Sequence, residues 1–313
     1  MYLYQSHSLN KIETILCFVV IRLMSLKNIL RLSHRITVNW HLEKDCNYKC
    51  KFCYAHFQDV TTRVGFNESL KLLDTIRENG IYKINFAGGE PFLNKNLGDY
   101  IKYSKGIGMK TSVITNASKM TNSWLDEYSE YIDQIGISCD SLSNEVNTEL
   151  GRGFGNHIDL IKRALQRIRQ IKINKNLPIQ IKLNSVILRN NHMEDWNEFI
   201  LNNDIDRWKV LKILKIIGEN EHVYDELSIT DDEFNAFIDR HPIVEDQGIL
   251  VKESNDDMEM SYLMITPDGR FYQNKNNEYI YSDPILTVGF QNAMEQCGFD
   301  YEKYIRRGGS YSL

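Results

Sequence analysis

The stretch ITVNWHLEKDCNYKCKFC, residues 36–53, alternates apolar and polar side chains and then brings three cysteines together. The alternation in residues 36–41 predicts a strand that leads into a loop. Cys46, Cys50 and Cys53 have the spacing C-x₃-C-x₂-C, and three thiolates can hold three irons of a 4Fe–4S cluster. When no fourth cysteine binds the fourth iron, that iron stays open to a small chelating molecule. Such a cluster is suited to chemistry more than to electron relay.

Closely spaced cysteines also bind zinc or form disulfides. Structural zinc usually takes its four ligands in two pairs, and no second pair is present here. His56 follows Cys53 by three residues, so a zinc site with three cysteines and one histidine stays open on spacing alone. The remaining cysteines, Cys17, Cys139 and Cys297, are scattered, unlike those of a secreted disulfide scaffold. A reducing cytoplasm is therefore expected.

The composition is that of an ordinary globular protein. A chain of 313 residues can bury a large core and form one α/β barrel or two domains. The net charge of −5 gives no general attraction to nucleic acid, which we do not expect as a direct partner.

The N-terminal segment, residues 1–33, is of uncertain status. Residues 15–24 (ILCFVVIRLM) are apolar apart from Arg22. This run is short for a membrane-spanning helix and lacks the flanks of a signal peptide. It is a buried first helix, an amphipathic helix on a membrane surface, or an upstream extension before initiation at Met24. The scarcity of Lys and Arg favours the first and third interpretations, so membrane contact is not expected.

Strand and helix patterns alternate through the middle of the chain. Strands are expected in residues 36–41, 81–87, 111–115, 134–139, 179–187 and 207–216, and helices in residues 69–78, 97–104, 124–131 and 158–171. Ile158, Ile161, Leu165 and Ile168 share one stripe of the last helix. Repeated β–α units predict a parallel sheet, and a barrel made from it carries its chemistry at the C-terminal strand ends.

The strand expected in residues 81–87 ends at the motif Gly88-Gly89-Glu90-Pro91. Paired glycines let the backbone approach a ligand closely, and Glu90 offers a carboxylate to an ammonium group. The same residues also suit a plain turn with Pro91 starting a helix. Together with the cysteine loop, the motif resembles the S-adenosylmethionine (SAM) site of radical SAM enzymes, in which the open iron chelates the amino and carboxylate groups of SAM.

Two lysines, Lys83 and Lys182, interrupt otherwise apolar strands. A lysine that points into a barrel is costly unless an anion pairs with it, and a triphosphate supplies such an anion. A single strand lysine more often points to solvent. Arg152, in the glycine-rich segment before the helix at 158–171, can pair with a carboxylate or a phosphate.

Longer blocks of the sequence resemble the viperin family and its prokaryotic members. The blocks are VNWHLEKDCNYKCKFC, KINFAGGEPFL, ISCDS with EVN and GRG following, KLNSVI, RWKVL, GEN, ESN, SYLMI and FDYEKYIRRGG. They occur in the family's order from about Val38 to Gly309. RWKV and the final RGG are not general features of radical SAM enzymes.

The resemblance implies a fold and an activity. The fold would be an α/β partial (β/α)₆ radical SAM barrel in residues 34–218, with a C-terminal extension in residues 219–313 that closes the site. The activity would be the antiviral dehydration of CTP, UTP or GTP to the 3′-deoxy-3′,4′-didehydro form, an RNA chain terminator. A 5′-deoxyadenosyl radical would take the ribose 4′ hydrogen. The alternatives are a radical SAM enzyme for another nucleotide or a peptide, and a zinc-binding interaction protein.

The resemblance also implies roles for particular residues. By this resemblance, the cluster ligands are Cys46, Cys50 and Cys53, the SAM-binding residues are Gly88, Gly89, Glu90, Asn116, Ser138 and Arg152, and the substrate-binding residues are Asn39, Lys83, Lys182, Asn184, Arg207 and Lys209. Tyr262 matches a tyrosine beside the substrate sugar and is the catalytic candidate. The sequence around it suits a tyrosine packed in the core equally well.

The expected partners follow from the same resemblance. They are a nucleoside triphosphate and an electron donor such as flavodoxin or ferredoxin, and the chain is expected to act as a monomer. The end of the chain at Leu313 lacks the longer Trp-ending tail through which animal viperins engage cluster-delivery proteins, so that partner is not expected. Arg306 and Arg307 either close over phosphates or belong to a solvated tail.

Overall fold

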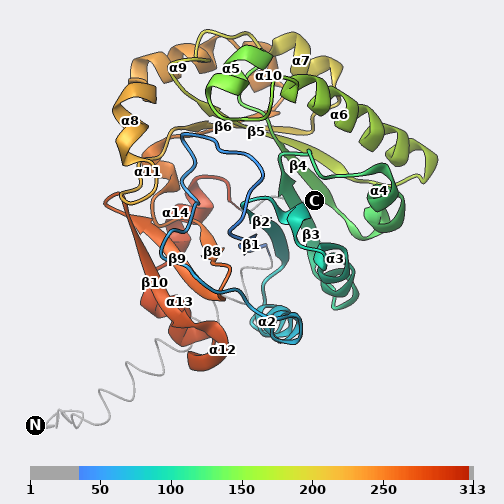
Figure 1. Ribbon diagram of the computed structural model, residues 1–313, viewed down its shortest axis with the longest axis vertical. Coiled ribbons are helices and arrows are strands. Elements are labelled where there is room, and N and C mark those ends of the chain that lie inside the picture. The colour runs from blue at the N-terminus through green and yellow to red at the C-terminus, as the bar shows by residue number, and fades with distance from the viewer. Residues whose placement is uncertain (1–34, 310–313) are drawn as a thin grey trace, which may run out of the picture.

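The computed structural model describes residues 35–309, and a single curved sheet of ten strands organises them (Figure 1). The strands are β1 (Thr37–Glu43), β2 (Lys83–Gly88), β3 (Lys110–Thr115), β4 (Gln134–Ser138), β5 (Gln180–Ile187), β6 (Arg207–Lys212), β7 (Leu250–Glu253), β8 (Leu263–Ile265), β9 (Arg270–Lys275) and β10 (Glu278–Pro284). Their order in the sheet is β10-β9-β8-β1-β2-β3-β4-β5-β6-β7. In this order, all strands from β8 to β7 pair in parallel with their neighbours, whereas β9 pairs antiparallel with both β8 and β10. The parallel strands confirm the expected partial barrel.

Helices connect the strands and cover the outer side of the curved sheet (Figure 1). They are α2 (Phe66–Glu78), α3 (Leu97–Gly106), α4 (Asn122–Tyr128), α5 (Asn144–Glu149), α6 (His157–Asn174), α7 (Asn197–Asn202), α8 (Glu221–Leu227), α9 (Asp231–Asp239), α10 (Pro242–Asp246), α11 (Asn255–Met258), α12 (Ile285–Val288), α13 (Phe290–Cys297) and α14 (Tyr301–Arg306), with 3₁₀ turns at Pro91–Leu93 and Ser129–Tyr131.

The core lies between the sheet and these helices because strand side chains alternate between two faces. On β2, Ile84 and Phe86 are fully buried in the main hydrophobic cluster. Asn85 and Ala87, which alternate with them along the strand, instead line a cavity on the inner face. The apolar stripe of α6, which includes Ile161 and Leu165, is likewise fully buried, as its spacing predicted.

The expected strand at residues 207–216 is shorter in the structure, where β6 ends at Lys212. The following residues turn instead around Asn220, which is fully buried. Its side chain accepts a hydrogen bond from the amide of Ile216 at 2.9 Å and donates one to the carbonyl of Leu214 at 2.9 Å. These local bonds replace a further strand ladder and bend the chain away from the sheet.

The C-terminal part of the chain adds strands to both edges of the parallel sheet. β7 pairs with β6 at one edge, and β8 pairs with β1 at the other. Helix α14 is tied to the first strand because the amide of Thr37 donates to the hydroxyl of Tyr304 at 3.0 Å, and that hydroxyl donates to the carbonyl of Arg35 at 3.1 Å. Residues after 219 are therefore integral to the sheet that surrounds the cavity.

The predictions for the N-terminal segment fall outside residues 35–309. Within that range, no helix has the length and apolar character needed to cross a bilayer.

Candidate active site

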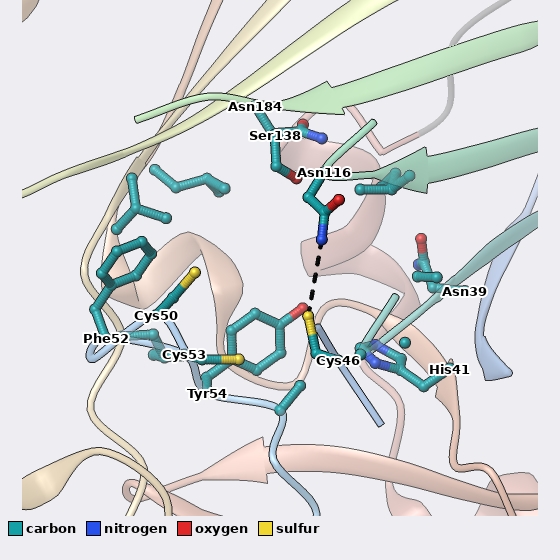
Figure 2. A pocket seen from close by; sticks show the side chains of 18 of the residues that line it. Asn39, His41, Cys46, Cys50, Phe52, Cys53, Tyr54, Asn116, Ser138 and Asn184 are labelled. Carbon is teal, nitrogen blue, oxygen red and sulfur yellow. Dashed lines mark hydrogen bonds between the residues drawn. The ribbon is translucent and has the colours of Figure 1, made fainter. Parts of the chain in front are cut away.

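A cavity of about 250 Å³ opens at the C-terminal ends of the barrel strands. It is lined by thirteen of the sixteen residues that the sequence singled out: Asn39, Cys46, Cys50, Cys53, Gly88, Gly89, Asn116, Ser138, Arg152, Lys182, Asn184, Lys209 and Tyr262. The other three do not line it: Arg207 is half-buried at the start of β6, and Lys83 and Glu90 are described below. Figure 2 shows the sulfur atoms of the three cysteines turned toward one space, with Asn116 and Ser138 across from them. The topology thus gathers residues from β1 to β8 around one volume.

The cysteine loop is held in place by backbone bonds to neighbouring segments. The amides of Lys49 and Lys51 donate to the carbonyls of Gly151 and Leu150 at 3.1 and 2.9 Å. From the far side, the Asn220 side chain donates to the carbonyl of Phe52 at 2.9 Å. The loop is therefore fixed on both sides, which holds the three thiols in position at the cavity.

The two glycines of the GGEP turn are explained by steric contacts. A Cβ on Gly88 would lie 2.5 Å from the carbonyl oxygen of Glu43, and one on Gly89 would lie 2.1 Å from that of Asp45. The amide of Gly89 donates to the carbonyl of Glu43 at 2.6 Å. Because no side chain fits, the turn packs directly on the segment that leads to Cys46.

Glu90 is buried, and its carboxylate is occupied by the chain itself. It accepts hydrogen bonds from the Thr115 hydroxyl at 2.6 Å, the Asn116 amide at 2.8 Å and the Phe92 amide at 3.2 Å. Burial raises the pKa of the Glu90 carboxyl. Its visible role is to tie the GGEP turn to the end of β3, and the binding of a SAM ammonium by Glu90 stays a prediction.

Two further residues of the predicted SAM site lie close to the cysteines. The Asn116 side chain donates to Asn47 at 3.1 Å and approaches the sulfur of Cys46 at 3.9 Å (Figure 2). The Nε of Arg152 is 2.5 Å from a carboxylate oxygen of Asp140, so the guanidinium is fixed by a nearly buried ion pair. The sequence left a carboxylate and a phosphate open as partners of Arg152, and here the partner is a carboxylate of the chain itself, while SAM binding by Arg152 stays a prediction.

Charged side chains occupy the opposite wall. Lys182 and Lys209 are nearly buried, as is Lys83, which lies deeper in the barrel and donates to Gln134 at 2.9 Å. Burial, and then the positive charge of Arg207, lower the pKa of Lys83 to about 7. Burial lowers the pKa of Lys209 to about 8. The strand lysines therefore do not point to solvent.

Tyr262 belongs to a cluster of charges that sequence reasoning missed in part. Its hydroxyl donates to Glu253 and accepts from Lys209, and the Arg307 guanidinium lies 3.7 Å from its ring centroid. Glu253 is 2.5 Å from Lys209 and 3.0 Å from Arg307. The blocks ESN and RRGG contain Glu253 and Arg307, but nothing in them indicates that the two residues meet. Arg307 is nearly buried here, so it does not belong to a solvated tail.

Aromatic side chains close the cavity on the side of β9 and β10. His41 contacts Tyr54, Phe57 and Tyr272 edge-on, with ring centroids 6.2, 5.0 and 5.6 Å apart. Burial lowers the pKa of His41 to about 3, so the imidazole is neutral. This wall is therefore built from packed rings. Asn39 lies beside it and accepts a hydrogen bond from Asn85 at 2.8 Å.

Comparison with known proteins identifies the family. Residues 44–201 match the radical SAM superfamily. Over 284 residues the chain is 37% identical to the S-adenosylmethionine-dependent nucleotide dehydratase of Flammeovirga pacifica. The aligned residues cover 88% of this chain and 95% of that protein. This chain belongs to the SAM-dependent nucleotide dehydratase family. A relative of the same name from Lacinutrix mariniflava is 39% identical over 88% of this chain and 58% of its own length.

Solved structures agree on the fold of this radical SAM enzyme. The structure of anSMEcpe with bound AdoMet has a TM-score of 0.63 over 86% of this chain and 83% of that chain. Its sequence is 15% identical, so the likeness concerns the fold alone.

The site fits the cofactors of the superfamily, a 4Fe–4S cluster and SAM. Burial raises the pKa of Cys50 to about 12 and that of Cys53 to about 11, so a bound cation is needed to hold these thiols as thiolates. Within residues 35–309, no three His, Cys, Asp or Glu side chains are arranged to share one metal ion. A cubane presents a separate iron to each thiolate. The histidine that could have completed a zinc site, His56, has its Nδ1 3.5 Å from the carboxylate of Glu219. The same carboxylate accepts a hydrogen bond from the backbone amide of His56 at 2.7 Å.

Proposed function

We propose that this dehydratase removes water from a nucleoside triphosphate, CTP, UTP or GTP, to give the 3′-deoxy-3′,4′-didehydro nucleotide. One observation supports this most strongly. A single cavity has the cysteine loop and the GGEP turn on one wall and the buried cations Lys182 and Lys209 on the other. A radical source and an anion site that face each other suit chemistry on the sugar of a bound nucleotide.

When bound, a cluster held by Cys46, Cys50 and Cys53 and a SAM molecule would together supply a 5′-deoxyadenosyl radical able to remove the ribose 4′ hydrogen. The chain's part is to orient both reactants, because a cofactor's chemistry depends on where its reactive atom lies. Asn116, Ser138 and Arg152 line the cavity together with Gly88 and Gly89, and we assign this side of it to SAM. Lys182 and Lys209 would bind the triphosphate through charge-assisted hydrogen bonds, with Lys83 and Arg207 below them.

Tyr262 is the group that we assign to the sugar. After hydrogen removal, the 3′ hydroxyl leaves as water, and the balance requires one electron and one proton. The Tyr262 hydroxyl carries a proton held between Lys209 and Glu253. Burial and the Glu253 carboxylate raise the pKa of Tyr262 well above its usual value, so the phenol stays protonated. At neutral pH it therefore keeps its proton, and Lys209, which donates to the same oxygen, would replace a proton that Tyr262 passes to the leaving 3′ hydroxyl.

The aromatic wall has a protective part in this scheme. His41, Tyr54 and Tyr279 line the cavity, and we expect their rings to keep water away from it. A dry site limits side reactions of a radical and strengthens the electrostatic contacts to the triphosphate. The product would act as an RNA chain terminator in antiviral defence. We place the enzyme in the reducing cytoplasm as a monomer, away from membranes, supplied by a flavodoxin or ferredoxin.

The test is an anaerobic turnover assay on the enzyme with its cluster reconstituted. SAM, dithionite and each nucleoside triphosphate are added separately, and the products are analysed by mass spectrometry. The proposal predicts 5′-deoxyadenosine together with one nucleotide lighter by one water. Formation of 5′-deoxyadenosine with every nucleotide intact would contradict it, because the radical would then act on another substrate.

A further inference from the structure

The outer side of the cysteine loop forms an exposed surface one residue away from a cluster ligand. Lys49 and Lys51 flank Cys50 in the chain and are exposed, whereas Cys50 itself is 8% exposed and lines the cavity. Consecutive Cα atoms are about 3.8 Å apart. An electron that arrives at this surface therefore needs to pass through very little protein to reach the cluster.

Three lysines of this surface have no acidic partner. Lys119 follows Ser118, whose hydroxyl accepts from Asn47 of the cysteine loop at 2.8 Å, and it is exposed like Lys49 and Lys51. Within residues 35–309, the ion pairs involve none of these three lysines. At the border, the side chain of Glu149 accepts a hydrogen bond from Asn190 at 2.9 Å. The patch is positive on a chain whose net charge is −5.

An exposed aromatic residue stands beside these lysines. Phe154 is 80% exposed, and its ring packs edge-on against Tyr48 of the cysteine loop with centroids 5.7 Å apart. It lies between Gly153 and Gly155, both with positive φ, in the segment whose backbone bonds to Lys49. The glycines project Phe154 away from the core. Exposed aromatic residues with surrounding charge are typical anchors of protein interfaces.

We propose that Lys49, Lys51, Lys119 and Phe154 form a docking surface for an acidic one-electron carrier protein. The proposal rests on the proposed function, because radical formation from SAM consumes an electron that this chain must receive. The balance is simple: the carrier is oxidised by one electron, the cluster is reduced by one, and no bond forms or breaks. A small, positive patch with one aromatic anchor suits a brief encounter, since redox complexes bury little area and rely on electrostatic steering.

The experiment uses a bacterial flavodoxin as the probe. Stopped-flow absorbance follows reduction of the reconstituted cluster by flavodoxin hydroquinone, and calorimetry measures binding of oxidised flavodoxin. For the double variant Lys49→Glu/Lys51→Glu, we expect the second-order reduction rate to fall about tenfold or more at low salt, with a smaller difference at high salt. Phe154→Ser is expected to weaken binding while leaving the salt dependence unchanged.

Two controls separate docking from other effects. Reduction by dithionite, a small reductant, is expected to stay the same in all variants. Lys71→Glu changes an exposed lysine of α2, away from the cysteine loop, and is expected to leave the flavodoxin rate unchanged. If the double variant holds less iron, Lys49→Gln/Lys51→Gln and the salt dependence of the unaltered enzyme give the same test.

The outcomes are distinct. Equal flavodoxin rates in the unaltered and charge-reversed enzymes, both with full iron content, would overturn the docking surface, as would a rate of the unaltered enzyme that ignores salt. If the unaltered enzyme dehydrates no nucleotide with dithionite as reductant, the proposed function is contradicted. The measured rates of reduction by flavodoxin would still test the docking surface.

Discussion

The wall made by β1–β4 meets the cavity through backbone and short polar side chains, whereas the wall made by β5–β8 presents long charged side chains and a tyrosine. The first wall is fixed by close packing, as at Gly89, where a Cβ would lie 2.1 Å from Asp45. The second is fixed by opposite charges, as where Glu253 joins Lys209 and Arg307. In the proposed function, shape would hold one reactant and charge would hold the other.

The largest expected effect is on the first wall, from Cys50→Ala. With a cluster ligand removed, we expect the iron content to fall and both SAM cleavage and nucleotide dehydration to be lost. Iron and sulfide analysis after reconstitution checks this. Cys297→Ala is the matched control, because Cys297 is a buried cysteine too but lies in α13, outside the cavity. Equal iron content in the two variants would remove the basis for the cluster site.

Gly89→Ala tests whether shape fixes the first wall. Overpacking costs about 1–3 kcal/mol, and each 1.4 kcal/mol is tenfold in affinity, so we expect the dissociation constant of SAM to rise about 10- to 100-fold. Gly106→Ala is the control, since a Cβ there meets nothing within 4 Å. Equilibrium dialysis of SAM measures both. An unchanged affinity of the Gly89 variant would mean that the turn yields at little cost.

Glu253→Gln tests whether charge fixes the second wall. The variant keeps the shape of the side chain but loses the charge that holds Lys209 and Arg307, so Tyr262 loses its fixed orientation. We expect kcat for dehydration to fall about 10- to 100-fold, because even a small misplacement of a reacting group slows a reaction by this much. Glu278→Gln, on an exposed position of β10, is the control. SAM affinity should stay unchanged in both, and a loss of SAM binding would break the division between the two walls.

The effect of pH should also separate the walls. Lys83 and Lys209 have pKa values lowered by burial to about 7 and about 8, so both are cationic at pH 6 and neutral at pH 9. We expect the affinity for a nucleoside triphosphate to decrease about tenfold or more across that range, since charge-assisted hydrogen bonds are lost as pH rises. Binding titrations at constant ionic strength measure it. In Lys209→Arg the loss of affinity between pH 6 and pH 9 should be smaller, because arginine stays charged. An equally steep loss in this variant would exclude Lys209 as the titrating group that binds the triphosphate.

The smallest effect is expected outside both walls. The Thr121 side chain accepts from the Trp124 amide at 3.2 Å and caps α4 on the outer side of the barrel. Thr121→Ala should lower the free energy of unfolding by about 1 kcal/mol, measured by urea denaturation, with unchanged turnover. Reduced turnover at full iron content would show that the outer helices also set the geometry of the cavity.

The two walls also differ in how far the sequence predicts them. The first is encoded in short contiguous motifs, so C-x₃-C-x₂-C and GGEP indicate its place at once. The β–α alternation likewise predicts β1–β6. β7 and β8 have only four and three residues, too few to show a period, and they were not predicted. Glu253 and Arg307 are 54 residues apart, so their contact depends on the complete sheet.

The central claim is that the site directs a radical to the ribose 4′ position of a nucleoside triphosphate. The most direct measurement supplies the reconstituted enzyme with SAM, dithionite and a triphosphate carrying deuterium only at C4′. We expect one deuterium in the 5′-deoxyadenosine and none in the dehydrated nucleotide. Unlabelled 5′-deoxyadenosine, formed together with a nucleotide that keeps its deuterium, would contradict the account.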